Sequence, residues 1–181
     1  MYRIGDIVVH PCHGAGVIDS IKEEKIDGCT RMYYAIKITD VELDLKFTTE
    51  GAKRIGVRPI IDSKQADELM AEISQIDAKM AGSWNNRHRE NLQRIKSGEL
   101  IEVARVIKGL MTRGVEKGLS TIDRDTLKKA KQIFISEIVL SKKLTSEEVE
   151  SQLTQIFISG IVESKKLNYD DVESRINASL A

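Results

Sequence analysis

Residues 17–38 read VIDSIKEEKIDGCTRMYYAIKI and contain the clearest structural signal in the chain. Asp27-Gly28 lies between two stretches rich in β-branched and aromatic residues. This dipeptide, flanked by such stretches, is the strongest short-range indication of a β-hairpin. The stretch therefore predicts two antiparallel strands joined by a tight turn.

Two neighbouring stretches extend this pattern. Residues 7–9 are Ile-Val-Val after Gly5-Asp6, and in residues 43–47 apolar side chains alternate with Asp44 and Lys46. Such alternation predicts a strand with one buried and one wet face. Several short strands with tight turns predict a small closed barrel of the SH3 or Tudor kind over residues 1–60. Barrels of this size are more often interaction modules than enzymes.

After Pro59 the sequence changes to helical periodicity and keeps it. Residues 62–65 form a capping box, Ser83 can cap a helix over residues 84–96, and Gly118 ends the next helix. We therefore expect an α+β protein of two domains, with the barrel followed by an all-α domain over residues 61–181.

An internal repeat occupies the C-terminal part of this helical region. Residues 132–153 return as residues 155–176, with 14 of 22 aligned positions identical. Each copy is typical of a helix end, a Ser-Lys-Lys-Leu turn and a capped helix start, with Thr145 and Asn168 as the caps. The repeat predicts a duplicated helical hairpin that extends the domain.

Charge is distributed unevenly, although the 28 basic and 28 acidic residues balance. Residues 84–131 carry 12 Lys/Arg and 6 Asp/Glu, while the segments on both sides of them are acidic. Local charge, and not the total, decides phosphate binding. From charge alone, polyanion binding and solvated helix faces remain equally good interpretations.

Residues 83–91 are the most informative part of the basic block. They hold the only tryptophan, Trp84, in the predicted first turn of a helix, together with Arg87 and Arg89. A helix N-terminus offers free N–H groups to phosphate, and an aromatic wedge can enter a minor groove. Packing of Trp84 in the core is the alternative, and the residues alone leave both open. Arg124, Lys128 and Lys131 recur at helical spacing as a second basic group.

His10, Cys12 and His13 lie within four residues and raise the question of a metal site. A structural zinc site needs four ligands and a catalytic one usually three, but no second Cys or His group completes this set. No nucleophile arrangement or phosphate loop stands out either. We therefore expect no enzyme activity, no metal and no cofactor. With only two cysteines and no apolar run of membrane-spanning length, we expect a cytoplasmic protein with reduced thiols.

Together, these residues resemble the CarD/CdnL family of bacterial RNA polymerase-binding transcription regulators. The N-terminal part resembles the polymerase-interacting domain shared with the transcription-repair coupling factor. The features that carry the resemblance are residues 4–11, 13–16 and 56–58, Trp84 with Arg87, and residues 91–92, 96–98, 103–104, 118–120 and 129–132. They cover residues 1–153 in one order.

The resemblance implies a mechanism. The barrel would bind the RNA polymerase β subunit, and the helical domain would hold promoter DNA at the upstream edge of the transcription bubble. It would thereby stabilise the open complex without base-specific readout. No small-molecule substrate and no membrane are implied, and we expect a monomer that reaches the nucleoid through polymerase.

The resemblance also assigns residues to each surface. Trp84 would be the wedge, beside DNA-contacting residues Arg87, Arg89, Arg124, Lys128 and Lys131. Glu24, Leu45, Lys46 and Phe47 would contact polymerase, with Glu24 at a position where relatives can carry a basic residue.

Two other interpretations belong to different functional classes. In one, the barrel binds a protein and the helices are a scaffold with no DNA contact. In the other, His10, Cys12 and His13 serve a metal-dependent enzyme. Salt-dependent binding to forked DNA would exclude the scaffold interpretation, and substoichiometric zinc in the purified protein would exclude the metal-dependent enzyme.

Overall fold

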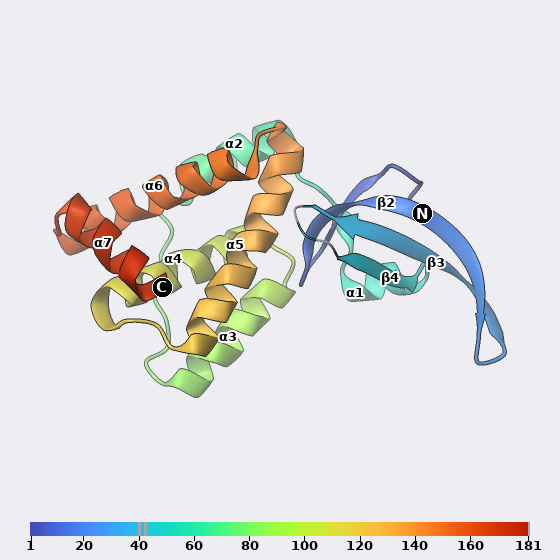
Figure 1. Ribbon diagram of the computed structural model, residues 1–181, viewed down its shortest axis with the longest axis horizontal. Coiled ribbons are helices and arrows are strands. Elements are labelled where there is room, and N and C mark those ends of the chain that lie inside the picture. Colours follow the sequence, from blue (N-terminus) through green and yellow to red (C-terminus); the bar gives the residue numbers. More distant parts are fainter. Residues whose placement is uncertain (40, 42, 181) are drawn as a thin grey trace.

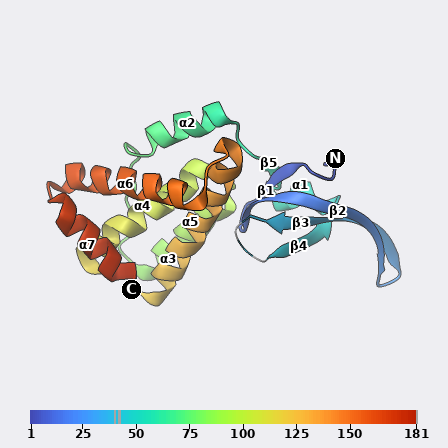
Figure 2. The same ribbon diagram turned by 45° about the horizontal axis from the view of Figure 1, so that its top comes forward.

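The computed structural model describes residues 1–39, 41 and 43–180 and has two parts, a sheet and a group of helices (Figure 1). Asp40, Glu42 and Ala181, the last residue of the predicted helical domain, lie outside the described residues. The sheet packs against one end of the helical part, and the C-terminus lies among the helices (Figure 2). The predicted α+β class, with a small β domain before an all-α domain, is confirmed.

Five strands form one antiparallel sheet in the order β4-β3-β2-β1-β5. They are β1 (Ile7–His10), β2 (Gly14–Ile26), β3 (Cys29–Ile38), β4 (Asp44–Thr48) and β5 (Arg58–Pro59), with the short helix α1 (Gly51–Ile55) between the last two. The predicted hairpin is confirmed, because Ile26 pairs with Cys29 across Asp27 and Gly28. These two residues have φ angles of 51° and 79°, as a two-residue turn of type I′ requires.

The helical part buries a continuous apolar core. Its helices are α2 (Ser63–Glu72), α3 (Trp84–Lys96), α4 (Leu100–Lys117), α5 (Thr121–Lys142), α6 (Ser146–Lys165) and α7 (Tyr169–Leu180). The predicted caps form, since the side chains of Asp62, Ser83 and Thr145 accept hydrogen bonds from the first turns of α2, α3 and α6. Among the described residues, no helix is long and apolar enough to cross a membrane.

The two copies of the repeat form two successive helix junctions. Each copy ends a helix at a lysine in the left-handed conformation, Lys143 after α5 and Lys166 after α6. In each copy the preceding helix ends with a lysine that forms an ion pair: Lys142 with Asp67 of α2, and Lys165 with Glu116 of α4. Equivalent residues of the repeat therefore dock against different helices.

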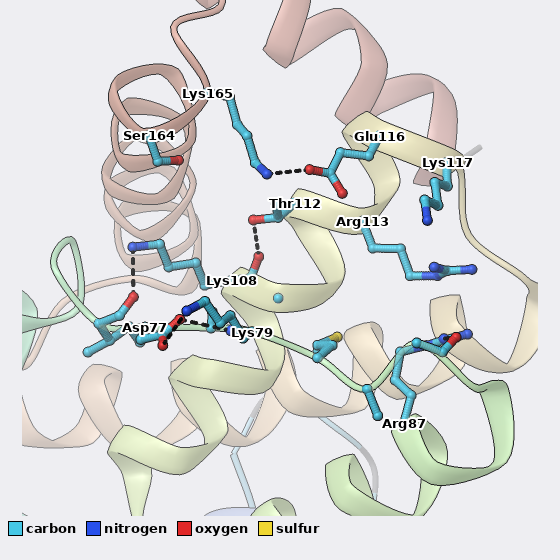
Figure 3. A pocket seen from close by; sticks show the side chains of 16 residues that line it. Asp77, Lys79, Arg87, Lys108, Thr112, Arg113, Glu116, Lys117, Ser164 and Lys165 are labelled. Atoms are coloured by element: carbon cyan, nitrogen blue, oxygen red, sulfur yellow. Dashed lines mark hydrogen bonds and ion pairs between the residues drawn. The ribbon is translucent and has the colours of Figure 1, made fainter.

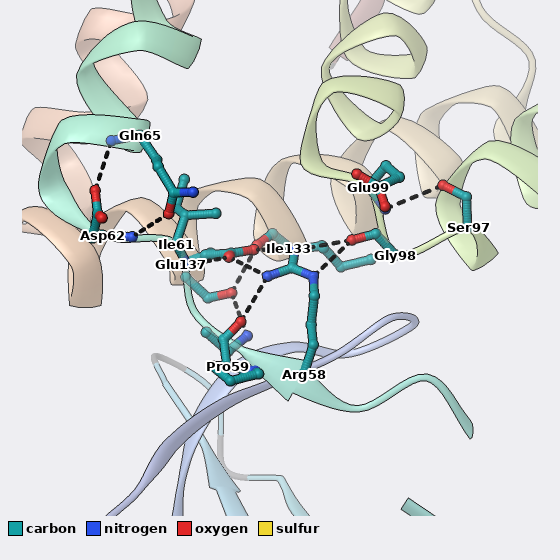
Figure 4. A network of polar contacts seen from close by, with 12 residues as sticks. Arg58, Pro59, Ile61, Asp62, Gln65, Ser97, Gly98, Glu99, Ile133 and Glu137 are labelled. Carbon is teal, nitrogen blue, oxygen red and sulfur yellow. Dashed lines mark hydrogen bonds and ion pairs between the residues drawn. The ribbon is translucent and has the colours of Figure 1, made fainter. Parts of the chain in front are cut away.

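A buried ion pair joins the sheet to the helices (Figure 4). The guanidinium of Arg58 on β5 donates to both carboxylate oxygens of Glu137 on α5, at 2.6 and 2.8 Å. It also donates to the carbonyl oxygen of Gly98, at 2.9 and 3.0 Å. Glu137 is 0% exposed and accepts a further hydrogen bond from the backbone N–H of Ile61. The pair thus connects β5, α5, the α3–α4 loop and the segment that leads into α2.

A second contact fixes β2 against α5. The N–H of Ala15 donates to Ser136 Oγ at 2.9 Å, and a Cβ at Gly14 would collide with the same oxygen. Only glycine allows this approach, and its φ of 92° also lies in the region that favours glycine. The sheet and the helical part therefore meet through specific, close-packed contacts.

Candidate functional site

Trp84 is an exposed residue at the start of α3. Ser83 caps this helix by accepting a hydrogen bond from the N–H of Asn86, and 44% of Trp84 is exposed. The indole stacks on the imidazole of His88 with ring centroids 5.8 Å apart and planes 2° from parallel. The interpretation of Trp84 as a core residue is therefore wrong, and an oriented aromatic ring lies beside the positive end of a helix.

Arg87, predicted to contact DNA, is only 2% exposed. Its guanidinium lies 3.3 and 3.4 Å from the two carboxylate oxygens of Asp123 in the first turn of α5. To reach a phosphate, the guanidinium would have to leave this buried carboxylate, and breaking a buried ion pair costs a large amount of free energy. We therefore give Arg87 a positioning role, because it holds the first turns of α3 and α5 together.

The carboxylate of Asp123 is the centre of this link. Burial by itself raises the pKa of Asp123, but hydrogen bonds from Arg87 and Ser120 outweigh burial and hold the pKa below its usual value. Arg113 of α4 adds a third contact, with Nε 3.6 Å from the carboxylate. Asp123 is therefore ionised at neutral pH and ties together three helices.

The remaining basic residues differ in their exposure to solvent and in their partners within the protein. Arg89 of α3 and Arg124 and Lys128 of α5 are exposed. Helices α3 and α5 begin at the same end of the helical part (Figure 1). Lys131 is different, since its side chain is 14% exposed and its ammonium lies 3.1 Å from Glu150 of α6. Three of the predicted DNA-contacting cations are thus exposed, Arg89 with a hydrogen bond to Asn86 of its own helix, while Arg87 and Lys131 pair with carboxylates.

Of the predicted polymerase-contacting residues, three lie on β4, a terminal strand of the sheet, and Glu24 lies on β2, two strands away. Lys46 forms an ion pair with Glu24 and lies 5.1 Å from the ring centre of Tyr33. Leu45 is half-buried, whereas Phe47 packs within the core of the sheet beside Tyr34. The edge of β4 and the Glu24–Lys46 pair therefore form the accessible part of this surface, and Phe47 supports it from inside.

His10 ends β1, and Cys12 and His13 lie in the turn that follows it, near Lys129 of α5. The rings of His10 and His13 are 4.7 Å apart, and His10 Nδ1 accepts a hydrogen bond from the N–H of Cys12. Within residues 1–39, 41 and 43–180, no three His, Cys, Asp or Glu side chains converge as metal ligands would. Burial, the His13 imidazole and the Lys129 ammonium lower the pKa of His10 from 6.5 to about 4.

This lowered pKa predicts a pH-dependent stability. The unfolded chain takes up a proton at His10 near pH 6.5, and the folded chain does so only near pH 4. We expect the free energy of unfolding to fall as the pH drops through this range, and a His10→Gln variant to lose part of the dependence. Urea unfolding across the range measures both, and identical pH profiles would contradict the assignment. Protonation of Asp123 also lowers the free energy of unfolding, but only at lower pH, because the pKa of this carboxylate lies below its usual value.

The sequence is similar to known proteins over most of its length. Residues 2–61 match the CarD-like/TRCF RID domain family, and residues 68–154 match the CarD C-terminal domain family. A Bacillus subtilis (strain 168) protein described as "Putative transcription factor YdeB" is 29% identical over 151 residues. That alignment covers 83% of this chain and 99% of the relative. The second copy of the repeat, residues 155–176, lies beyond the matched domains.

Proposed function

The chain belongs to the CarD family of transcription regulators that interact with RNA polymerase, and we propose that it holds the upstream edge of the promoter bubble while docked on the polymerase β subunit. Trp84 is the wedge, and Arg89, Arg124 and Lys128 contact the DNA backbone around it. The protein thereby acts in the cytoplasm, on the nucleoid, as a regulator and not as an enzyme.

The observation that carries this proposal is the exposure of Trp84. An apolar ring that remains 44% exposed has forgone much of the stability that burial would give. Its stacking on His88 orients the indole, and the capped start of α3 places positive backbone charge beside it. An oriented aromatic flanked by cations suits insertion at a DNA step whose stacking is already weakened.

The polymerase surface is proposed at the outer edge of β4. A terminal strand can add a strand of another protein through main-chain hydrogen bonds. Lys46 and Glu24 lie next to this edge and neutralise each other, so a partner need not bring a strongly charged patch of one sign. The groove beside them, of about 160 Å³, is lined by Ser20, Lys22, Glu24, Tyr33, Ala35 and Lys46.

Stabilisation of the open complex follows from differential affinity. A wedge and backbone cations that fit the separated strands better than closed duplex shift the equilibrium toward the open state. Phosphate contacts carry no sequence information, so the effect depends on promoter kinetics and not on a recognition sequence.

The backbone contacts predict a change in salt dependence. Each phosphate contact contributes about 0.7–0.9 to the slope of log affinity against log salt. We expect Arg124→Ala and Lys128→Ala each to lower the slope for polymerase-bound protein on forked DNA by about one. Lys131→Ala should lower it less, because this ammonium is paired with Glu150. Lys64→Ala on the distant helix α2 is the control.

The alternative function is an adaptor whose sheet binds polymerase or another protein while the helices make no DNA contact. It predicts no measurable affinity for forked DNA at low salt, even with polymerase present, and unchanged slopes in both variants. That outcome would replace the proposed function.

A further inference from the structure

A cationic pocket lies between the loop that precedes α3 and helices α4 and α6 (Figure 3). Its volume is about 530 Å³. Six basic and two acidic side chains line it: Lys79, Arg87, Lys108, Arg113, Lys117 and Lys165 with Asp77 and Glu116. A pocket of this size accommodates a small molecule, and its charge selects an anion.

Several of these cations lack full partners within the protein. Arg113 and Lys117 are one turn apart on α4, so their charges repel each other. Asp123, the carboxylate that pairs with Arg113, is shared with Arg87. Among the described residues, Arg113 Nε forms only the long ion pair with Asp123, at 3.6 Å, and no hydrogen bond, and Lys117 has no ion pair there. The pocket therefore has donors and positive charge left for a ligand.

The acidic side chains do not cancel this surplus. Glu116 is occupied by Lys165, with an N–O distance of 2.5 Å, and Asp77 lies 3.9 Å from the Lys79 ammonium. Lys108 is committed as well, since its ammonium donates to the carbonyl oxygens of Ser74 and Ile76 at 2.6 and 3.0 Å. The side chains most available to a ligand are therefore Arg113 and Lys117, with Lys79 beside them and Lys165 available once it leaves Glu116.

One wall of the pocket belongs to the second copy of the repeat. Ser164 and Lys165 line it from α6, beyond residue 154, where the match to the CarD C-terminal domain ends. Gly160 allows this close packing, because a Cβ there would lie 3.0 Å from the Ser74 carbonyl oxygen. The pocket is thus built jointly by the family domain and by the extension of this chain.

We propose that this pocket binds a small anion carrying two or more phosphate groups. Arg113 and Lys117 hold one phosphate, and Lys165 and Lys79 approach the next. Guanidinium and ammonium groups are the usual phosphate ligands, and charge-assisted hydrogen bonds are the strongest available to them. A concave pocket suits a compact ligand, whereas duplex DNA would meet the exposed cations of α3 and α5.

The pocket is also connected to the wedge. Residues 78–82 line it and lead directly to Ser83 and Trp84, and Arg87 lines it from the first turns of α3. A bound anion therefore sets the position of the helix start that carries Trp84. This regulatory consequence rests on the proposed function, whereas binding itself does not.

The test is calorimetric titration of the full chain with tripolyphosphate, without polymerase or DNA. We expect binding at one site, weakened about tenfold or more by Lys117→Glu and clearly weakened by Lys165→Ala. Both residues are exposed, so the fold should be retained. Lys96→Glu, an exposed lysine at the end of α3 outside the pocket lining, removes the same charge and should leave binding unchanged.

Absence of saturable binding would overturn the proposal, as would equal weakening by Lys96→Glu, which would indicate general attraction to a polyanion. Equal tripolyphosphate affinity of the wild type and Lys117→Glu would also overturn it, even if Lys117→Glu weakened duplex DNA binding. Trp84 is the only tryptophan, so its emission reports the connection to the wedge. A saturating change supports the connection, and binding with no change in emission overturns it.

Discussion

Replacement of Trp84 by alanine is expected to shorten the lifetime of the open complex by roughly fivefold to a hundredfold while polymerase binding is retained. Stacking of an aromatic side chain on a base contributes about 1–3 kcal/mol, and this contact is made only where the strands part. Because 44% of Trp84 is exposed, its removal should change protein stability little. Lifetimes measured with purified cognate polymerase, after addition of a DNA competitor, give the result directly.

The control for this prediction is Trp84→Phe, which retains a ring at the start of α3 and should keep part of the effect. Affinity for polymerase alone is measured for both variants, so that a docking defect is not mistaken for loss of the wedge. Equal lifetimes for wild type and Trp84→Ala would show that Trp84 is not the wedge. The helical domain would then act through Arg89, Arg124 and Lys128, or through protein contacts.

The second large effect is expected at the junction between sheet and helices. Arg58→Ala leaves the carboxylate of Glu137, 0% exposed, with the N–H of Ile61 as its one donor among the described residues. Loss of one partner of a buried ion pair costs about 3–5 kcal/mol. We expect the free energy of unfolding of Arg58→Ala, measured with denaturant, to be lower than that of the wild type by this amount. The sheet and the helices should also begin to unfold in separate transitions, because one of the contacts that couple them is lost and only the packing of β2 on α5 remains described between them.

Arg54→Ala is the matched control, since Arg54 is an exposed arginine four residues away in α1. Its removal should change the free energy of unfolding by no more than about 0.5 kcal/mol. Arg58→Lys should lie between the two, because it keeps the charge but cannot donate two hydrogen bonds to the carboxylate at once. A single unfolding transition and a control-sized loss in Arg58→Ala would show that the junction does not depend on this pair.

Local features of the fold were predictable because local chemistry determines them. Asp27-Gly28 specifies a turn with two positive φ angles, and the caps at Asp62, Ser83 and Thr145 use only neighbouring backbone groups. Alternation in residues 43–47 also predicted the burial of Phe47. That signal conflicts with the assignment of Phe47 to polymerase contact, and in the structure its ring lies within the core.

What the sequence could not reveal depends on partners far away in the chain. Arg87 is 36 residues from Asp123, so nothing local distinguished it from the exposed Arg89. Glu137 was also missed, although a glutamate inside the apolar stretch of α5 was a usable signal. The cationic pocket requires the relative placement of α4, α6 and a loop, which periodicity does not give. The DNA and polymerase contacts themselves stay predictions.

The repeat also records how the chain was lengthened. Each copy carries its own stop, at Lys143 or Lys166, and its own capping side chain, at Thr145 or Asn168. A tandem duplication of such a unit therefore adds a complete helix in a single genetic event.

The differences between the copies correspond to differences in their surroundings. Glu137 corresponds to Gly160, where the Ser74 backbone and the Lys108 side chain take up the space that a larger side chain would need. Leu140, partly buried on α5, corresponds to the exposed Glu163. The two copies thus differ where their neighbours differ, whereas the residues that start and stop their helices have the same roles in both.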